Sequence, residues 1–243
     1  MTDGLVIIPA LNERAALGDV LDSLAELDDA LDVLVVDDGS TDDTAAVARA
    51  HGASVAPLPY NLGIGGALRT GFRYAVRHGY LWAVQFDADG QHEPAAIATL
   101  RAQLDDGADL VIGSRFTDGS DYEVSAARGS AMSLLRLLVR ILTGRRFTDT
   151  SSGCRGFSRP MLEFFGRNYP VEYMESVESL VLAVGAGFDV REVPVQMSSR
   201  ASGVASTRRL RLVYHFLRVL VVMLVSKGAL RDQRRQPEPE PSA

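Results

Sequence analysis

Residues 34–51 read LVVDDGSTDDTAAVARAH, a stretch that joins an apolar run to a helix-like segment through a cluster of acidic side chains. Leu34–Val36 is short, apolar and rich in β-branched residues, as buried strands are. The run ends on Asp37-Asp38-Gly39, and Thr41–His51 then has the composition of a helix. This stretch therefore predicts a strand that leads into a helix through a turn lined with carboxylates.

The same alternation continues on both sides of this stretch. Before it, Leu5–Pro9 is an apolar run closed by proline, and Glu13–Leu27 carries apolar residues at the spacing of an amphipathic helix. After it, strand-like and helix-like runs alternate up to residue 112. Further strands are expected at 53–56, 81–86 and 110–112, and further helices at 65–78 and 94–104. This order predicts an α/β fold, with a Rossmann-like, mostly parallel sheet and helices on both faces.

The middle of the chain is less regular. Between residues 114 and 158 the sequence predicts one helix, Ser130–Thr143. Beyond it we expect a helix over residues 173–186 and a strand at Phe188–Val193. Residues 1–206 are expected to form a single α/β domain.

The C-terminal part has a different character. Residues 200–235 contain nine Lys and Arg but one acidic residue, and Leu210–Val225 carries a broad apolar stripe beside a narrow polar one. The stripe is too short to span a bilayer, and Arg218 interrupts it. We expect residues 207–232 to form a basic amphipathic helix that lies on a membrane surface or docks on a partner, with burial in the domain as the alternative. Residues 233–243, with three prolines, are expected to be disordered.

Composition sets further limits. The 243 residues include one cysteine, Cys154, so no disulfide forms within the chain. The segment after Met1 lacks the basic and apolar regions of a signal peptide. Both observations favour a cytoplasmic protein, and we expect no nucleic acid partner.

Acidic side chains follow two of the predicted strands, at the sheet edge where α/β proteins bind ligands. Asp87-Ala88-Asp89-Gly90-Gln91-His92 comes after one of these strands, and its glycine permits a turn that brings both carboxylates to one hard cation. The candidate metal ligands are Asp87, Asp89 and Gln91. By itself, such an acid pair is more often a solvated turn, so its meaning depends on the neighbouring motifs.

Two further motifs accompany the acid pair. Asp37 and Asp38 either accept hydrogen bonds from a nucleoside or favour the start of the following helix. Asn61-Leu62-Gly63-Ile64-Gly65-Gly66 resembles a phosphate cradle in front of a helix, but it lacks the lysine of a P-loop. Glycines that permit close packing near a nucleotide are the more modest interpretation.

In their order along the chain, these motifs resemble those of family 2 glycosyltransferases of GT-A fold. The resemblance begins at Ile8-Pro9-Ala10-Leu11-Asn12-Glu13, passes through the three motifs above and continues to Gly113-Ser114-Arg115, Ser152-Gly153-Cys154-Arg155 and residues 192–206. It is greatest to the branch that transfers mannose or glucose to dolichol or polyprenyl phosphate. The resemblance implies an inverting transfer of a hexose from GDP-mannose or UDP-glucose to a polyprenyl phosphate, with Mg²⁺ or Mn²⁺ as cofactor.

The resemblance also implies roles for individual residues. Arg115 and Arg128 would hold the phosphate of the acceptor, and Asp89 would act in catalysis through the metal. A phosphate acceptor is already anionic, so it needs positioning more than deprotonation. The reaction would take place at the cytoplasmic face of the membrane, where the chain is peripheral and a small membrane protein is a further candidate partner. The residues that would bind the nucleotide sugar are Pro9, Ala10, Asn12, Glu13, Asp37, Asp38, Gly65, Asp87, Ala88, Asp89, Arg200 and Ser206.

Two other functions stay open. If the acceptor is a hydroxyl of a saccharide or small molecule, a general base is required. Glu172, Glu175 and Asp149 are the candidates, although both glutamates could equally be surface charge at the start of a helix. The alternative of another class is a non-catalytic subunit that binds a nucleotide sugar, and the intact pair of Asp87 and Asp89 argues against it.

Overall fold

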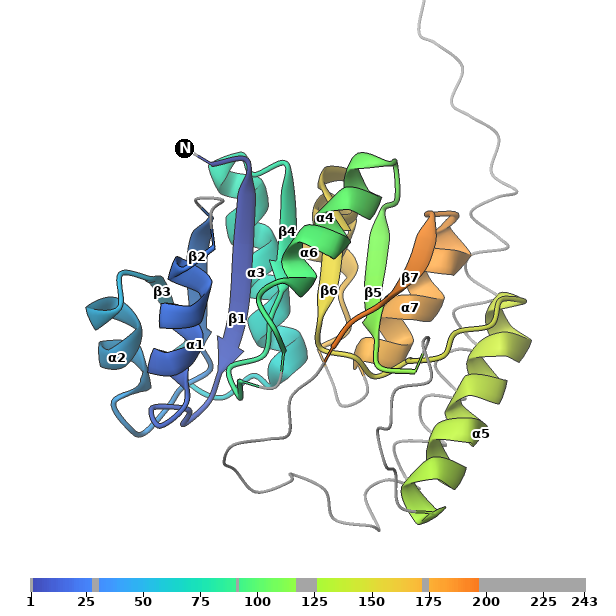
Figure 1. The fold of residues 1–243 in the computed structure, drawn as a ribbon, viewed down its shortest axis with the longest axis horizontal. Coiled ribbons are helices and arrows are strands. Elements are labelled where there is room, and N and C mark those ends of the chain that lie inside the picture. The colour runs from blue at the N-terminus through green and yellow to red at the C-terminus, as the bar shows by residue number, and fades with distance from the viewer. Residues whose placement is uncertain (1, 28–30, 91, 117–125, 172–174, 197–243) are drawn as a thin grey trace, which may run out of the picture.

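The computed structural model describes residues 2–27, 31–90, 92–116, 126–171 and 175–196, with the side chains of 126–131 left out. The described residues form a seven-stranded sheet in the order β3-β2-β1-β4-β6-β5-β7 (Figure 1). β6 is antiparallel to both of its neighbours, and the other adjacent pairs are parallel. The predicted α/β fold with a mostly parallel sheet is therefore confirmed. The strands are β1 Gly4–Ala10, β2 Asp32–Asp37, β3 Ser54–Pro57, β4 Trp82–Gln85, β5 Leu110–Ser114, β6 Arg155–Ser158 and β7 Val190–Pro194.

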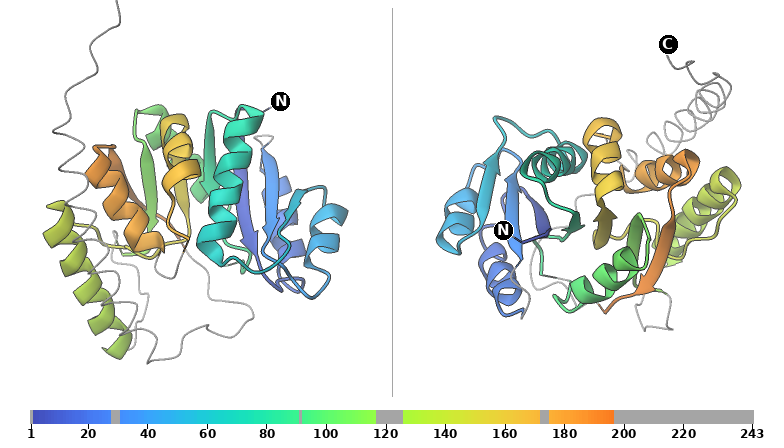
Figure 2. Two further views of the ribbon diagram at one scale, coloured as in Figure 1. Left: turned by 180° about the vertical axis from the view of Figure 1, so that it is seen from behind. Right: turned by 90° about the horizontal axis from the view of Figure 1, so that it is seen from above.

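Helices cover both faces of this sheet, as the view from above in Figure 2 shows. α1, α2 and α4 bury apolar residues against one face, and α3, α6 and α7 pack against the other. α5 packs against α7 and buries Leu138 and Val139 in the same hydrophobic cluster as α3, α6 and α7. The helices are α1 Leu17–Ala25, α2 Thr44–Ala50, α3 Ile64–His78, α4 Ala96–Asp105, α5 Ala126–Thr143, α6 Arg159–Asn168 and α7 Glu175–Ala186.

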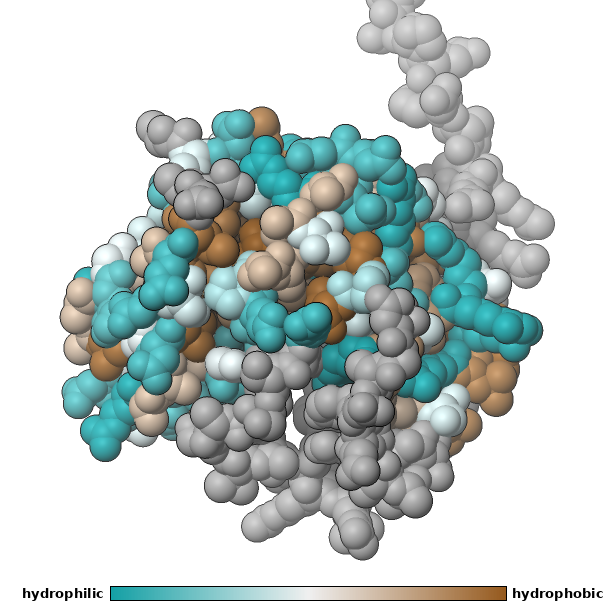
Figure 3. Space-filling model, viewed as in Figure 1, coloured by the Kyte–Doolittle hydropathy of each residue, from teal (hydrophilic) through white to brown (hydrophobic). Residues whose placement is uncertain are grey.

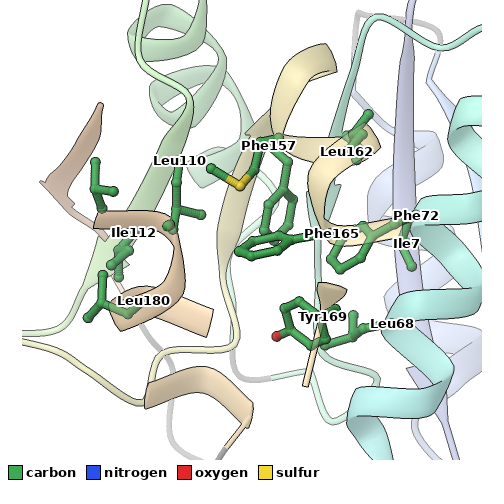
Figure 4. Close-up of a cluster of buried hydrophobic side chains, with 14 of the residues drawn as sticks. Ile7, Leu68, Phe72, Leu110, Ile112, Phe157, Leu162, Phe165, Tyr169 and Leu180 are labelled. Carbon is green, nitrogen blue, oxygen red and sulfur yellow. The ribbon is translucent and has the colours of Figure 1, made fainter. Parts of the chain in front are cut away.

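Aromatic rings form the centre of the core between the sheet and α3 and α6 (Figure 4). The ring of Phe72 lies 4.8 Å from that of Phe157 and 5.1 Å from that of Tyr169, measured between centroids. The ring of Phe165 lies 4.9 Å from that of Tyr169, edge to face. These contacts join α3, β6 and α6, so the antiparallel strand is fixed in the sheet by aromatic packing as well as by its hydrogen bonds.

The structure differs from the sequence prediction in several places; α1 begins at Leu17 rather than at Glu13, and α5 begins at Ala126 rather than at Ser130. β6 and α6 were not predicted, since residues 114–158 were expected to hold a single helix and nothing regular was expected at 159–168. α2 begins at Thr44 rather than at Thr41, because the residues before it form a loop tied to the end of β1. The N–H of Thr41 donates to Asn12 Oδ1 over 2.8 Å, and the N–H of Asn12 donates to Ser40 Oγ over 2.9 Å.

Register brings the acidic segments to one edge of the sheet. Ala10 at the end of β1 pairs with Asp37 at the end of β2, and the last residue of β4, Gln85, pairs with Ile7 and with Arg155, the first residue of β6. The segments after β1, β2, β4 and β5 and the segment before β6 therefore meet at the carboxyl edge, which is the lower edge in Figure 1. In the part of the chain that the structure describes, no helix is both long and apolar enough to cross a membrane.

Candidate active site

The acid pair follows β4 directly. β4 is buried along its length, and the N–H of Phe86 still donates to the carbonyl of Ile7, so the strand carries the chain up to the edge before it turns. Asp87 and Asp89 are half-buried on either side of the buried Ala88, and Gly90 closes the turn in the left-handed region at φ 73°. Both carboxylates thus lie at the edge of the sheet, partly accessible. Gln91 lies outside the described residues.

His92 and Gly153 hold Asp87 in place from two sides. Nε2 of the buried His92 lies 3.3 Å from Asp87 Oδ2, while its Nδ1 has no hydrogen-bond partner among the described residues. Across the site, Gly153 approaches so closely that a Cβ there would overlap the Asp87 carboxylate. The predicted motif of residues 152–155 therefore has a physical reason for its glycine at this point.

The Gly153→Ala variant should lower the rate of sugar transfer by about tenfold to a hundredfold, because the added methyl group displaces the Asp87 carboxylate. Steady-state kinetics and Mn²⁺ titration should show weaker metal binding with little change in the melting temperature. The matched control is Gly166→Ala in α6, where a Cβ would make only ordinary van der Waals contacts with Arg73, to its Cγ at 3.5 Å and to its backbone N and Cα at 3.8 and 3.9 Å. Equal activities of the two variants would contradict this account of Gly153.

A buried arginine lies behind the acid pair. Arg155 is 1% exposed, and its partners among the described residues are neutral oxygens: the carbonyls of Ser152 (2.9 Å), Thr150 (3.2 Å) and Ser176 (3.0 Å), and Ser179 Oγ (3.1 Å). It therefore joins the segment before β6 to the first turns of α7. The sequence placed Arg155 in a motif but assigned it no role, because nothing in the local pattern shows which segments surround it.

Glu175, a candidate base, begins α7 next to this arginine. Its carboxylate is 8% exposed and accepts a hydrogen bond from Ser176 Oγ over 2.8 Å. Burial raises the pKa of Glu175; the Ser176 hydroxyl and the charge of Arg155 oppose this, whereas the like charge of Asp87 adds to it. The surface-charge interpretation of Glu175 is thus wrong, since the residue is buried beside the site. Glu172 lies outside the described residues.

Arg115, a candidate ligand of the acceptor phosphate, follows β5 at the same edge. Its Nε lies 2.6 Å from Asp149 Oδ2 and its Nη2 lies 2.9 Å from Asp149 Oδ1, a bidentate ion pair. Burial alone would raise the pKa of Asp149, but the Arg115 guanidinium holds it below the usual value. A carboxylate held in this way is a weak base, so the arrangement does not favour Asp149 as general base. Arg128 lies in the first turn of α5, and its side chain is outside the described part.

The residues expected at the nucleoside mostly hold loops together. Both oxygens of the buried Asp38 accept backbone N–H groups, from Leu62 over 2.7 Å and from Gly63 over 2.9 Å, and burial raises the pKa of Asp38. Asp37 accepts the N–H of Ser40 over 3.0 Å. These bonds hold the loops that follow β2 and β3 together at the carboxyl edge; direct contact of either carboxylate with a nucleoside stays a prediction.

The remaining predicted ligands border this edge or lie outside the described residues. Pro9 and the buried Ala10 end β1, and Asn12 adopts the left-handed conformation at φ 57° with Glu13 following it. A Cβ at Gly65 would overlap the backbone of Pro170 and Val171, so this glycine allows α3 to approach the segment before α7. Arg200 and Ser206 are outside the described part.

The described residues fit a divalent cation at the acid pair. Two half-buried carboxylates share one turn, and the charge of Asp87 raises the pKa values of Cys154, Tyr169 and Glu175, whose first cause is burial. A bound cation would relieve this concentration of negative potential. No cluster of three or more His, Cys, Asp or Glu side chains suited to a metal occurs among the described residues. Mg²⁺ sites that use one or two carboxylates are commonly completed by water and substrate phosphates.

Comparison with known proteins identifies similar chains. Residues 5–165 match the model of glycosyl transferase family 2. The chain is 33% identical over 213 residues to polyprenol monophosphomannose synthase of Mycolicibacterium smegmatis, covering 83% of this chain and 79% of that protein. It is 33% identical over 211 residues to undecaprenyl-phosphate mannosyltransferase of Micrococcus luteus, covering 82% and 85%. Among solved structures, glucosyl-3-phosphoglycerate synthase from Mycobacterium tuberculosis with Mn²⁺, uridine diphosphate and phosphoglyceric acid is similar at a TM-score of 0.70, with 25% identity and 92% and 78% of the two chains covered.

Proposed function

This chain belongs to glycosyl transferase family 2, and on that premise we propose that it transfers a hexose from a nucleotide sugar to a polyprenyl phosphate, with inversion at the anomeric carbon. The observation that carries the proposal is the meeting of Asp87 and Asp89 with Arg115 at one sheet edge, in a chain similar over four-fifths of its length to two enzymes named for such lipid phosphates. GDP-mannose and UDP-glucose are the donors we favour.

Different residues would bind the donor and the acceptor. Asp87 and Asp89, with Gln91, would hold Mg²⁺ or Mn²⁺ against the donor diphosphate, and the metal when bound stabilises the charge of the leaving nucleoside diphosphate. His92 and Gly153 keep Asp87 in position for this task. On the acceptor side, Asp149 fixes the plane of the Arg115 guanidinium, which with Arg128 would grip the phosphate.

The acceptor phosphate can attack without a general base, because it is ionised at neutral pH. The main competing reaction, transfer to a hydroxyl, does require a general base. The competitor draws support from Glu175, a buried carboxylate near Asp87, and from the similar synthase solved with phosphoglyceric acid. In that case Glu175 would remove the hydroxyl proton.

The Glu175→Gln variant tests Glu175 as the general base of the competing reaction. If the acceptor is a phosphate, transfer should stay within about tenfold of the wild-type rate, since the amide keeps the shape of the side chain. Loss of 10²-fold or more, on the order of what a general base contributes, would instead favour the hydroxyl reaction. Glu178→Gln, one turn later in α7 and similarly buried, controls for the removal of a buried carboxylate from this helix.

A direct test incubates the purified chain with Mn²⁺ or Mg²⁺, a short-chain polyprenyl phosphate and a panel of radiolabelled nucleotide sugars. Label should enter the organic phase from one donor and should vanish when the metal is chelated. NMR of the product reports the anomeric configuration. Release of nucleoside diphosphate with no label in the organic phase from any donor would count against the lipid phosphate acceptor.

The proposal also places the chain at the cytoplasmic face of the membrane, as a peripheral protein. Residues 207–232, outside the described part, would contact lipid there, and the division into domain 1–206, this segment and the tail 233–243 stays a prediction. A membrane protein partner is the alternative contact for the same segment.

A further inference from the structure

The segment between α5 and β6 carries Asp149, the carboxylate that pairs with Arg115. In Figure 1 this segment crosses the lower ends of β7 and β5. It contains no helix or strand of its own, so its shape depends on contacts with its neighbours. One of these contacts comes from Glu192 of β7, which is 43 residues away from Asp149 in the chain. The orientation of Arg115 is therefore linked to an edge strand of the sheet.

The carboxylate of Glu192 accepts two consecutive backbone N–H groups. Both of its oxygens lie 2.9 Å from the backbone N of Thr148, and Oε1 also lies 2.9 Å from the backbone N of Asp149. The hydroxyl of Thr148 donates to the same Oε1 over 3.3 Å. A carboxylate only accepts hydrogen bonds, so it can take all three donors at once, and its charge strengthens each bond. Glu192 thereby fixes the backbone from which the Asp149 side chain leaves.

A second path leads from Glu192 to the backbone on either side of Arg115. Ser114 Oγ lies 2.6 Å from Thr148 Oγ1 and accepts the N–H of Phe116 over 3.2 Å. Because the Thr148 hydroxyl donates to Glu192, the Ser114 hydroxyl donates to Thr148. Ser114 is 1% exposed, so water has little access to this path. Glu192 thus holds Arg115 through its backbone as well as through the partner of its guanidinium.

The position of Glu192 in β7 is one at which a carboxylate needs such donors. Charged residues usually lie on the surface, as the hydrophilic residues over much of the front face in Figure 3 do. Side chains alternate along a strand, so Glu192 is on the same side of β7 as Val190, which is fully buried in the cluster with α7. A carboxylate there is favourable only when it is hydrogen-bonded. The printed donors to Glu192 all belong to the segment that carries Asp149.

We propose that Glu192 is a positioning residue for the acceptor, which acts through Asp149 to hold the Arg115 guanidinium in the plane that grips the phosphate. The inference rests on the proposed function, which assigns Arg115 to the acceptor phosphate. Bidentate recognition of a phosphate depends on the plane of the guanidinium, and a small displacement of a positioning group lowers the rate of reaction. Loss of Glu192 should therefore impair use of the acceptor and leave the donor and the metal unaffected.

Steady-state kinetics of Glu192→Gln test this role. The amide nearly keeps the shape of the side chain, but it replaces one acceptor oxygen with a donor that faces backbone N–H groups. The value of kcat/KM for a short-chain polyprenyl phosphate should fall by about tenfold to a hundredfold, chiefly through a higher KM. The KM of the nucleotide sugar should not change, and neither should the affinity for nucleoside diphosphate with Mn²⁺, measured by calorimetry.

The matched control is Asp109→Asn. Asp109 is a half-buried carboxylate that joins the same strands at the opposite edge of the sheet, directly before β5. It accepts the N–H of Asp189 over 3.0 Å and the hydroxyl of Ser158 over 2.9 Å. This variant should lose stability as Glu192→Gln does, but it should keep the wild-type KM for both substrates. The comparison separates the position of Arg115 from the general stability of β5, β6 and β7.

A double-mutant cycle with Asp149→Asn shows whether the effect passes through Asp149. Asp149→Asn should itself raise the KM for the acceptor, because the amide cannot form the same bidentate ion pair with Arg115. Adding Glu192→Gln to this background should raise that KM further by no more than about twofold, since residues that act through one another are not additive. Additive effects of the two substitutions would mean that Glu192 acts elsewhere.

A measurement without substrate keeps this inference separate from the proposed function. The Nε–H of Arg115, identified in ¹⁵N NMR spectra by its loss in Arg115→Lys, donates to Asp149 over 2.6 Å and should exchange slowly with water. In Glu192→Gln its exchange should be faster by about tenfold, because the ion pair opens more often. Asp109→Asn should leave the exchange unchanged. If the wild type transfers no sugar to polyprenyl phosphate, the proposed function fails, and the exchange rates still decide whether Glu192 holds Arg115.

Three results would overturn the inference: equal acceptor kinetics of Glu192→Gln and Asp109→Asn, additive effects in the cycle, or unchanged exchange at Arg115. If Glu192→Gln does not fold, Thr148→Val takes its place, since it removes the hydroxyl link and keeps both backbone hydrogen bonds to Glu192. Its KM for the acceptor should rise by about threefold, with faster exchange of the Arg115 Nε–H. A Thr148→Val variant with wild-type values of both would then contradict the inference.

Discussion

Replacing Asp89 with Asn should lower the rate of sugar transfer by about 10³-fold, because the amide removes a charged oxygen from the metal that stabilises the leaving diphosphate. The fold should persist, since Asp89 is half-buried in a turn at the sheet edge and outside both hydrophobic clusters. Transfer kinetics measure the first effect. Electron paramagnetic resonance of Mn²⁺ should show weaker metal binding without any turnover.

The control for this substitution is Asp105→Asn. Asp105 is an exposed carboxylate at the end of α4 that pairs with Arg101 over 3.3 Å, and surface pairs of this kind contribute little. We expect this variant to match the wild type in transfer and in metal binding. An Asp89→Asn variant that transfers sugar at the wild-type rate would remove the basis for placing the metal at the acid pair.

Replacing Arg155 with Met should reduce the free energy of unfolding by about 3–5 kcal/mol, because each buried acceptor that loses its donor costs about 1–3 kcal/mol. The guanidinium is 1% exposed and supplies hydrogen bonds to four neutral oxygens, three of them backbone carbonyls. A thioether of similar length leaves these acceptors without donors and out of reach of water. In urea unfolding, the variant should have a lower midpoint urea concentration and an unchanged m-value.

Arg159→Met supplies the matched comparison. Arg159 also donates to two backbone carbonyls, of Tyr80 and Val76, but its side chain is 31% exposed, so water can replace the lost donors. Its loss should cost about 1 kcal/mol. If the two variants unfold at the same urea concentration, burial of the Arg155 guanidinium is not what stabilises this part of the fold.

The Arg155→Met variant should also change the pH dependence of stability. The pKa of Glu175 is raised chiefly by burial, and Arg155 is one of the groups that limit the rise. A carboxyl whose pKa is higher in the folded state binds its proton more tightly there, so stability falls as pH rises from the ordinary value near 4.5 through the folded pKa. Without Arg155 this window extends to higher pH, and the variant should regain part of its lost stability in acid.

The alternating part of the fold was predictable because its signal is local. Between residues 5 and 112, each strand is a short apolar run and each helix repeats its apolar residues at a helical period, so their order alone indicates a parallel α/β sheet. The boundaries shifted where tertiary contacts decide them. The bond from Thr41 to Asn12, 29 residues away, holds residues 40–43 outside α2, and no helix propensity reports it.

β6 and its surroundings could not be predicted from the sequence, because the contacts that define them are not local. Arg155–Ser158 is four residues long and carries a buried arginine, so it has no apolar period, and its partners β4 and β5 lie far away in the chain. The pairing of Arg115 with Asp149 likewise spans 34 residues. Motif resemblance identified Arg115 and the segment around Gly153, and Asp149 was only a candidate base; the assembled edge shows that Asp149 orients an arginine and that Gly153 makes room for Asp87.

The most direct test of the central claim compares two acceptors that differ only in the phosphate. The purified chain is given its donor, Mn²⁺ and either a short-chain polyprenyl phosphate or the corresponding polyprenol, and mass spectrometry identifies the products. We predict a polyprenyl phosphohexose from the first acceptor and no glycolipid from the second, because an alcohol needs a general base that the proposed reaction does not use. Glycosylation of the alcohol at a comparable rate, or no product from the phosphate while the nucleotide sugar is still consumed, would contradict transfer to a lipid phosphate.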